Sequence, residues 1–318
     1  VFKPSPQAAA SGEALVQCLY DAGVPEHVLH LCQGDSATAE ALIASEAVSA
    51  VFFTGSYTVG RAIHRQLAGR PEVLLALEMG GNNPFIVWHP DDVVQAAHCV
   101  ARSSWISGGQ RCTNSRRLIL PRDAGSEQLL AQLLALAHSL RVHDPLAEAQ
   151  PFYGSLLSQA ATERVLSYQQ KLIDLGAKVL APCSQPDASH PTLVRPGILD
   201  VTGIDCADEE CFGPLLLLRY ADDFPRALHV ANDTCYGLSA GLIDADPLNW
   251  QQFRRNVRAG VLSWNRPTAG ASGKMAFGGV GASGNHRSLA WHALDHLADP
   301  VAALSGEKLA EPQLPGLS

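Results

Sequence analysis

The sequence has few charged residues and no excess of positive ones. Charged residues make up 17% of the 318 residues, and the formal net charge is −8 with a pI near 5.8. Nucleic acids and anionic membranes both attract clustered Lys and Arg, and a chain with this balance offers little of that attraction. We therefore expect neither a nucleic acid nor a membrane as partner.

Metal-binding cysteine pairs and long apolar runs are also missing. Eight cysteines occur, at positions 18, 32, 99, 112, 183, 206, 211 and 235, without a Cys-x-x-Cys pair or a His/Cys spacing typical of zinc. No apolar run reaches the length of a membrane span, and no charged-then-apolar signal opens the chain. These absences predict free thiols, no metal site and a cytoplasmic protein.

The first third of the sequence alternates between predicted strands and predicted helices. Ser5 followed by Pro6 is typical of a helix start, and apolar residues then recur at helical spacing until Gly23. The strand predicted at 48–53 is apolar apart from Ser49, which predicts that both of its faces are covered. The alternation indicates a parallel α/β domain. The elements predicted after Gly23 are strands at 28–32 and 48–53 and helices at 37–44 and 61–67.

The last of these strands runs into a turn that contains Gly55 and Ser56, and Gly60 follows one helical turn later. Backbone N–H groups at a helix N-terminus bind anions such as pyrophosphate, and glycine lets the anion approach closely. Glycine at a strand-to-helix junction is nevertheless more often a turn device alone. By itself this run leaves both interpretations open.

Cys112 and Glu78 form a second candidate pair, each beside glycines. Cys112 follows Gly-Gly-Gln-Arg, and Glu78 precedes Met-Gly-Gly-Asn-Asn-Pro. A thiolate adds readily to an aldehyde, and hydrolysis of the resulting acyl-enzyme needs a carboxylate that activates water. A buried cysteine on its own usually serves only to fill the core.

These runs together resemble the aldehyde dehydrogenase superfamily. Further runs with the same resemblance occur in the family's order at 209–214, 232–238, 260–268 and 277–287. The resemblance implies an α/β fold in which parallel sheets are covered by helices, with a partial Rossmann-type cofactor domain and a catalytic domain. It implies NAD(P)-dependent aldehyde oxidation, with Cys112 as a nucleophile of lowered pKa and Glu78 as the general base.

The resemblance also implies cofactor contacts, residue by residue. A lysine in the family holds the adenosine ribose, a glycine turn holds the pyrophosphate, and a Glu-x-Phe pair contacts the nicotinamide ribose and ring. The family's glutamate that accepts the adenosine ribose hydroxyls is replaced here by Pro6, so both NAD and NADP stay open. The implied cofactor residues are Lys3, Gly55, Ser56, Gly60, Gly80, Glu210 and Phe212.

Three runs around Glu78, Cys112 and position 277 resemble the branch of the family that oxidises N-succinylglutamate 5-semialdehyde in arginine catabolism. Such a substrate carries two carboxylates, so cationic groups are expected near the thiol. Two alternatives stay open: another semialdehyde such as glutamate 5-semialdehyde, or a shortened, non-catalytic paralogue that binds nucleotide or assists assembly. The candidate substrate residues are Arg111, Arg266, His286 and Arg287.

We predict three parts: a partial cofactor domain at 1–77, a catalytic domain at 78–276, and a tunnel-mouth loop with an oligomerisation tail at 277–318. Residues 1–4 are interpreted as the end of a buried strand whose upstream segment is missing, together with the family's oxyanion asparagine. Its absence leaves an inactive chain as one expectation. We also expect a homo-oligomer in which 299–304 adds an edge strand to a neighbour, and disorder at 308–318.

Overall fold

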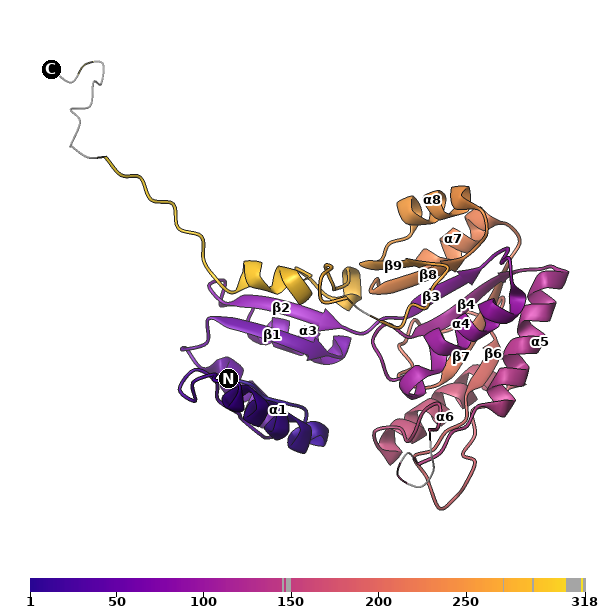
Figure 1. The fold of residues 1–318 in the computed structure, drawn as a ribbon, viewed down its shortest axis with the longest axis horizontal. Helices are drawn as coiled ribbons and strands as arrows, with labels where there is room; N and C mark the ends of the chain where they lie inside the picture. Colours follow the sequence, from indigo (N-terminus) through magenta and orange to yellow (C-terminus); the bar gives the residue numbers. More distant parts are fainter. Residues whose placement is uncertain (145, 147–149, 271, 288, 307–315, 317–318) are drawn as a thin grey trace.

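The computed structural model describes residues 1–144, 146, 150–270, 272–287, 289–306 and 316. Its strands form a small sheet, in the order β1-β2, and a large sheet, in the order β5-β6-β7-β4-β3-β8-β9 (Figure 1). The strands are β1 (Ala50–Gly55), β2 (Leu74–Met79), β3 (Asn83–Val87), β4 (Ser115–Pro121), β5 (Lys178–Ala181), β6 (Gly197–Asp200), β7 (Leu215–Ala221), β8 (Ser239–Ile243) and β9 (Val261–Trp264).

Helices surround both sheets, and none within the described residues is long and apolar enough to cross a membrane. The α-helices are α1 (Ala9–Asp21), α2 (Ser36–Ala44), α3 (Tyr57–Gln66), α4 (Val93–Trp105), α5 (Ala124–Ser139), α6 (Gln159–Asp174), α7 (Phe224–Asn232) and α8 (Pro247–Asn256). The 3-10 helices are η1 (Pro6–Ala8), η2 (Ile106–Gly109), η3 (Gly281–Ser283) and η4 (Ala290–His296).

The large sheet is covered on both faces. Phe85 and Val87 of β3 pack with α4 and α5, whereas Ile86 between them packs with α7 and α8. Strands buried on both faces are mostly apolar, which explains the apolar run at the start of β7, whereas β4 also buries Arg116 and Arg117. The predicted α/β fold with parallel sheets is confirmed, with β5 as the exception because it runs antiparallel to β6.

The small sheet departs from the prediction. β1 and β2 are parallel, and one face packs on α2 and α3 through Ile43, Ile63 and Val51. The predicted cover on both faces of β1 is wrong for this chain: Phe52, which points to the other face, is 44% exposed. Side chains alternate along a strand, so the residues on either side of Phe52 are the ones that reach the helices.

The N-terminal elements are partly as predicted. Ser5 accepts a hydrogen bond from the Gln7 N–H at the start of η1, and α2 covers the helix predicted at 37–44. The strand predicted at 28–32 is wrong, because only Leu31 forms a bridge, to Phe2. Pro4 has no N–H to continue that pairing. The buried strand end predicted at 1–4 is found only in part: Phe2 bridges Leu31 and Pro4 is buried, whereas Val1 is exposed.

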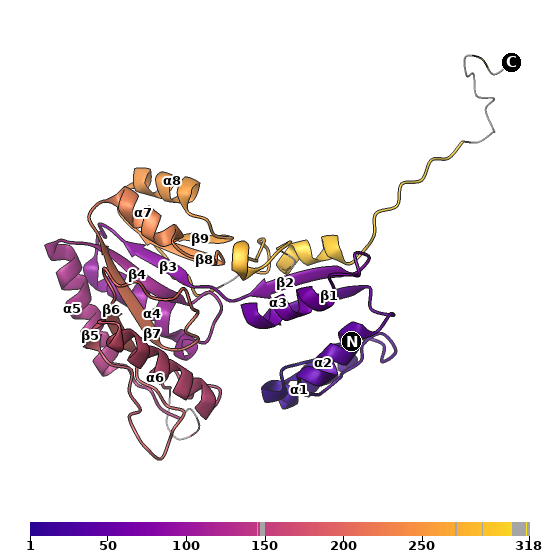
Figure 2. The ribbon, with the colours of Figure 1, turned by 180° about the vertical axis from the view of Figure 1, so that it is seen from behind.

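The change from the small to the large sheet occurs between Met79 and Asn83, close to the predicted limit at 77/78. The segment that contains η3 and η4 runs beside β2 in both views (Figures 1 and 2), and Gly284 bridges Glu78. Residues 301–306 are exposed and have no regular structure, so their pairing with a neighbour stays a prediction. The disorder predicted at 308–318 falls almost wholly outside the described residues.

Candidate active site

Cys112 lies in a loop of left-handed turns, the Cys112 loop (residues 106–114), between α4 and β4. Ser107, Gly108 and Gly109 have φ angles of 58°, 64° and 70°, a region that favours glycine. A Cβ at Gly109 would also overlap the backbone of Gly213. The two glycines therefore let the chain turn sharply while it touches the segment at 208–214, the Glu210 loop.

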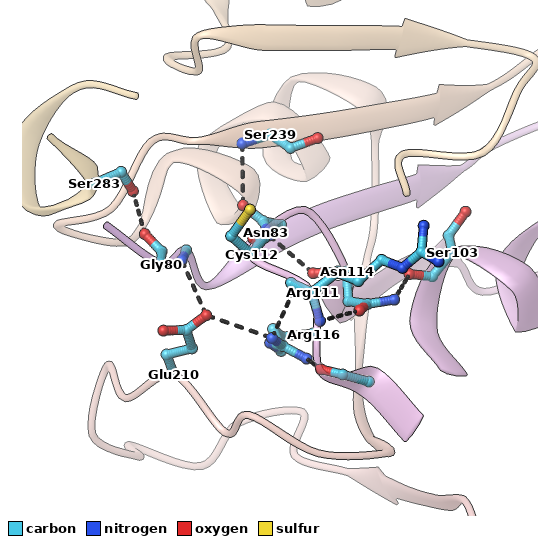
Figure 3. A network of polar contacts seen from close by, with 12 residues as sticks. Gly80, Asn83, Ser103, Arg111, Cys112, Asn114, Arg116, Glu210, Ser239 and Ser283 are labelled. Atoms are coloured by element: carbon cyan, nitrogen blue, oxygen red, sulfur yellow. Dashed lines mark hydrogen bonds and ion pairs between the residues drawn. The ribbon is translucent and has the colours of Figure 1, made fainter. Parts of the chain in front are cut away.

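Two buried asparagines hold the Cys112 loop in place (Figure 3). Asn83 donates from Nδ2 to the carbonyls of Cys112 and Asn114, at 2.7 and 2.8 Å, and its Oδ1 accepts from the Ser239 N–H at 3.0 Å. Asn114 donates to the Ser103 carbonyl and accepts from the Arg111 N–H, both at 2.7 Å. The nucleophile's backbone is thus tied to β3, α4 and β8.

Glu78 is a buried carboxylate near the end of β2. Its exposed fraction is 3%, and neither carboxylate oxygen has a hydrogen-bond partner among the described residues. Burial raises its pKa from near 4.5 to about 7. Glu78 therefore changes protonation near neutral pH, as a general base must.

The environment of Cys112 differs from the one predicted. Burial raises the pKa of the thiol, and the charges of Glu78 and Glu210 raise it further, while Arg116 lowers it. The predicted lowering is therefore wrong for this structure, because two carboxylates and desolvation outweigh one cation. Glu78 lies on β2 of the small sheet and Cys112 lies in the loop before β4 of the large sheet, yet the charge of Glu78 acts on the Cys112 thiol.

Glu210 and Phe212 both contact Arg116, next to the Cys112 loop. Glu210 Oε1 accepts from the Gly81 N–H at 3.2 Å and pairs with Arg116 at 3.4 Å, and the Arg116 guanidinium lies 5.2 Å from the centre of the Phe212 ring. A Cβ at Gly80 would overlap the Glu210 carboxylate, so only glycine leaves room for it. That these residues contact a nicotinamide ribose and ring stays a prediction.

The remaining cofactor candidates lie at the small sheet. Ser56 caps α3 by accepting from the Val59 N–H, and Gly55 ends β1 immediately before it. These two residues sit where an anion would meet the helix N-terminus. Gly60 instead faces Leu77 and Met79, which indicates helix–sheet packing. Lys3 is part-buried and donates to the Pro4 carbonyl at 3.1 Å.

The four candidate substrate residues are exposed, and they come from three segments. Arg111 precedes Cys112 and donates from Nε to Ser107 Oγ at 2.9 Å. The backbone of Arg287 lies near Glu78: a Cβ at Gly278 would lie 2.9 Å from Glu78 Oε2 and 2.8 Å from the Arg287 Cα. Arg266 follows β9, and the His286 ring lies 5.5 Å from that of His296. The structure thus brings Arg111 and Arg287 to the two catalytic candidates.

Several residues of the site were missed by the sequence reasoning. Ser283 donates to the Gly80 carbonyl at 2.7 Å and accepts from the Gly237 N–H at 3.0 Å, which joins three glycine-containing segments. Asn83, Asn114 and Arg116 were also missed. Each is a polar residue beside a glycine turn or a buried strand, and that is the only signal of their roles in the sequence.

Replacement of Glu78 by Gln should raise the free energy of unfolding, relative to that of the wild type, more at pH 8 than at pH 4. The folded state binds the Glu78 proton more tightly than the unfolded state, so the free energy of unfolding falls as pH rises from about 4.5 to about 7. The total loss is about 3 kcal/mol, and glutamine does not titrate. Urea denaturation at the two pH values measures the difference. Glu13→Gln, at an exposed carboxylate on α1, is the control, and a Glu78→Gln protein whose stability depends on pH as the wild type's does would contradict the prediction.

The chain is similar in sequence to known proteins. The pattern of the "Aldehyde dehydrogenase family" matches residues 1–301. N-succinylglutamate 5-semialdehyde dehydrogenase of Erwinia tasmaniensis is 46% identical, and that of Cronobacter sakazakii is 47% identical. Each alignment covers 100% of this chain and 65% of the relative. The chain therefore spans a little under two thirds of the length of these relatives.

A solved structure also resembles the fold. It is described as indole-3-acetaldehyde dehydrogenase in complex with NAD+, and it matches with a TM-score of 0.85 at 29% sequence identity. The match covers 92% of this chain and 60% of that one. The similarity therefore extends over both sheets.

Proposed function

The chain belongs to the aldehyde dehydrogenase family, and from this premise we propose that it oxidises N-succinyl-L-glutamate 5-semialdehyde to N-succinyl-L-glutamate with a nicotinamide nucleotide. The observation that carries the proposal is the pair of Cys112, held by Asn83 and Asn114, and a buried Glu78 without a partner in the described residues. The names of the two relatives support the choice of substrate.

In the proposed reaction, Cys112 first loses its proton to solvent and reacts as a thiolate, a form that the raised pKa of the thiol keeps scarce at neutral pH. Its sulfur attacks the aldehyde carbon, and the carbonyl π electrons move to oxygen to give a thiohemiacetal anion. Backbone N–H groups near the thiol, that of Cys112 among them, are proposed to donate to the new oxyanion. When bound, the nicotinamide nucleotide would accept the hydride from the substrate carbon. A thioester on Cys112 remains.

Glu78 then acts on water. As a carboxylate it takes a proton from the water that attacks the thioester, and the C–S bond breaks to release Cys112 as thiolate and the substrate as a carboxylic acid. The free carboxylate oxygens support this role, because no hydrogen bond to a described residue has to be broken first. A pKa of about 7 keeps the carboxylate form well populated at neutral pH.

The cofactor is proposed to bind along three segments. Gly55 and Ser56 at the start of α3 would receive the pyrophosphate, and Glu210 with Phe212 would contact the nicotinamide ribose and ring. Lys3 would contact the adenosine ribose. Pro6 offers no carboxylate to repel a 2′-phosphate, so NADP is proposed beside NAD.

The substrate's two carboxylates are proposed to bind the cationic group formed by Arg111, Arg266, His286 and Arg287. Arg111 has the strongest structural support, because its backbone N–H is fixed by Asn114 next to the nucleophile. Arg287 follows, since a Cβ built at Gly278 would lie close both to the Arg287 Cα and to Glu78 Oε2. A guanidinium can bind a carboxylate through two parallel hydrogen bonds.

Oxidation of the succinylated and the free glutamate 5-semialdehyde should differ clearly. One charge-assisted hydrogen bond contributes about 1.5–3 kcal/mol, so loss of the succinyl carboxylate should lower kcat/KM roughly 10- to 100-fold. Nucleotide reduction at 340 nm, measured with NAD and with NADP, tests this. Equal or better use of the free semialdehyde would replace the substrate assignment, and oxidation of neither would favour a non-catalytic, nucleotide-binding role.

A further inference from the structure

We propose that Arg116 is a positioning residue that ties the Glu210 loop to the Cys112 loop, so that contacts made on the cofactor side set the geometry of the nucleophile. This inference rests on the proposed function, because it assigns the cofactor to the Glu210 loop. Arg116 is the second residue of β4, and it lies between the two loops (Figure 3).

The guanidinium of Arg116 contacts both loops at once. Toward the Cys112 loop it donates to the carbonyls of Gly109 and Arg111. Toward the Glu210 loop it pairs with the Glu210 carboxylate and lies over the Phe212 ring. Hydrogen bonds in different directions and a flat stacking face are properties of arginine that lysine lacks.

The cost of burying Arg116 argues against a purely stabilising role. Its side chain is 2% exposed, and Nε has no hydrogen-bond partner in the described part of the chain. A buried donor without a partner costs about 1–3 kcal/mol, and a well-packed apolar side chain at such a position is often at least as stable as a buried ion pair. The position therefore favours a role that needs the charge and the shape.

The Arg116–Glu210 ion pair also connects the proposed cofactor site to the Cys112 loop. Glu210 Oε1 is shared between Arg116 and the Gly81 N–H, next to the glycine that makes room for it. A ligand that draws the Glu210 carboxylate toward its own hydroxyls must compete with Arg116. Any shift of Arg116 would change its hydrogen bonds to two carbonyls of the Cys112 loop. Arg116 is also the cation that lowers the pKa of Cys112, against Glu78 and Glu210, which raise it.

The test follows alkylation of Cys112 by iodoacetamide, quantified on its own peptide by mass spectrometry between pH 7 and 11, without and with NAD. Arg116→Met should raise the midpoint of the pH profile by about one unit, which slows alkylation about tenfold at pH 8. Arg116→Lys keeps the charge and should restore most of the midpoint. NAD should change the rate in the wild type and in neither variant.

Arg122→Met is the matched control. Arg122 follows the opposite end of β4, and it too pairs with a carboxylate, Asp222, and lies over a ring, that of Tyr220, but at the protein surface. This variant should keep both the wild-type midpoint and the response to NAD. Arg116→Lys also guards against misfolding, because it retains a buried cation of similar length.

A purely structural Arg116 would give a different result. Arg116→Met and Arg116→Lys would both lose thermal stability while keeping the wild-type midpoint of the alkylation profile and the full response to NAD. This outcome would overturn the inference. Calorimetric titration with NAD separates the two proposals. Binding of NAD to the wild type without any change in Cys112 alkylation would overturn only the role of Arg116. Absence of NAD binding would sink the proposed cofactor site and the coupling with it.

Discussion

Replacement of Cys112 by Ala should abolish aldehyde oxidation, with a fall in kcat of roughly 10⁴-fold or more, because loss of a nucleophile removes the covalent route altogether. Alanine leaves the loop intact, since Asn83 contacts the backbone carbonyl of Cys112 and not its sulfur. The measurement is nucleotide reduction with N-succinylglutamate 5-semialdehyde, together with a search for acyl-enzyme by mass spectrometry.

The chain offers a matched control for this variant. Cys18 is an exposed cysteine on α1, and its replacement by Ala should leave the rate unchanged. NAD binding by the Cys112→Ala protein should also be retained, which separates loss of chemistry from loss of the fold. Substantial oxidation by Cys112→Ala would exclude Cys112 as the nucleophile. Cys235, also exposed, would then be the next thiol to test.

Much of the fold could be predicted from the sequence, because strands and helices leave local patterns of apolar residues. The apolar runs of β3, β4 and β7 reflect burial on both faces of the large sheet, and such runs are visible in any sequence. β1 shows the limit of this reasoning. Its apolar run predicts cover on both faces, but whether a face is covered depends on what packs there, and in this chain Phe52 is largely open.

The site was predictable only in part, for a related reason. Cys112 and Glu78 stand in runs with a distinctive glycine pattern, and the roles of both were assigned from those runs. Asn83 and Arg116 act through backbone carbonyls and carboxylates that come from loops far away in the sequence. No spacing rule links Arg116 to Glu210. The contact of Arg116 with both loops can therefore be recognised only in the folded structure.

The buried Glu78 also connects function with stability. A carboxylate without partners in the described residues disfavours the folded state at neutral pH, and the same isolation raises its pKa into the range where a base works best. Proteins commonly tolerate such a loss of stability at a functional site. A hydrogen-bond donor placed beside Glu78 would lower the pKa and stabilise the fold, and it would weaken the base.

Replacement of Glu78 by Gln should block the second half of the reaction and leave the first half intact. We expect a burst of reduced nucleotide close to one per site, followed by steady turnover about 10²- to 10⁴-fold slower, the range for loss of a general base. Glutamine keeps the size of the side chain but cannot take a proton from water.

Rapid mixing of Glu78→Gln with the semialdehyde and NAD, with detection at 340 nm, resolves the burst, and mass spectrometry identifies the acyl group on Cys112. In the wild type, hydrolysis should speed up as pH rises through about 7, where Glu78 loses its proton, and the residual hydrolysis by the variant should lack this step. Glu72→Gln, at an exposed carboxylate upstream of β2, should behave as the wild type. Steady turnover by Glu78→Gln at the wild-type rate would assign the base to another group, and loss of the burst together with turnover would place Glu78 in the first half-reaction instead.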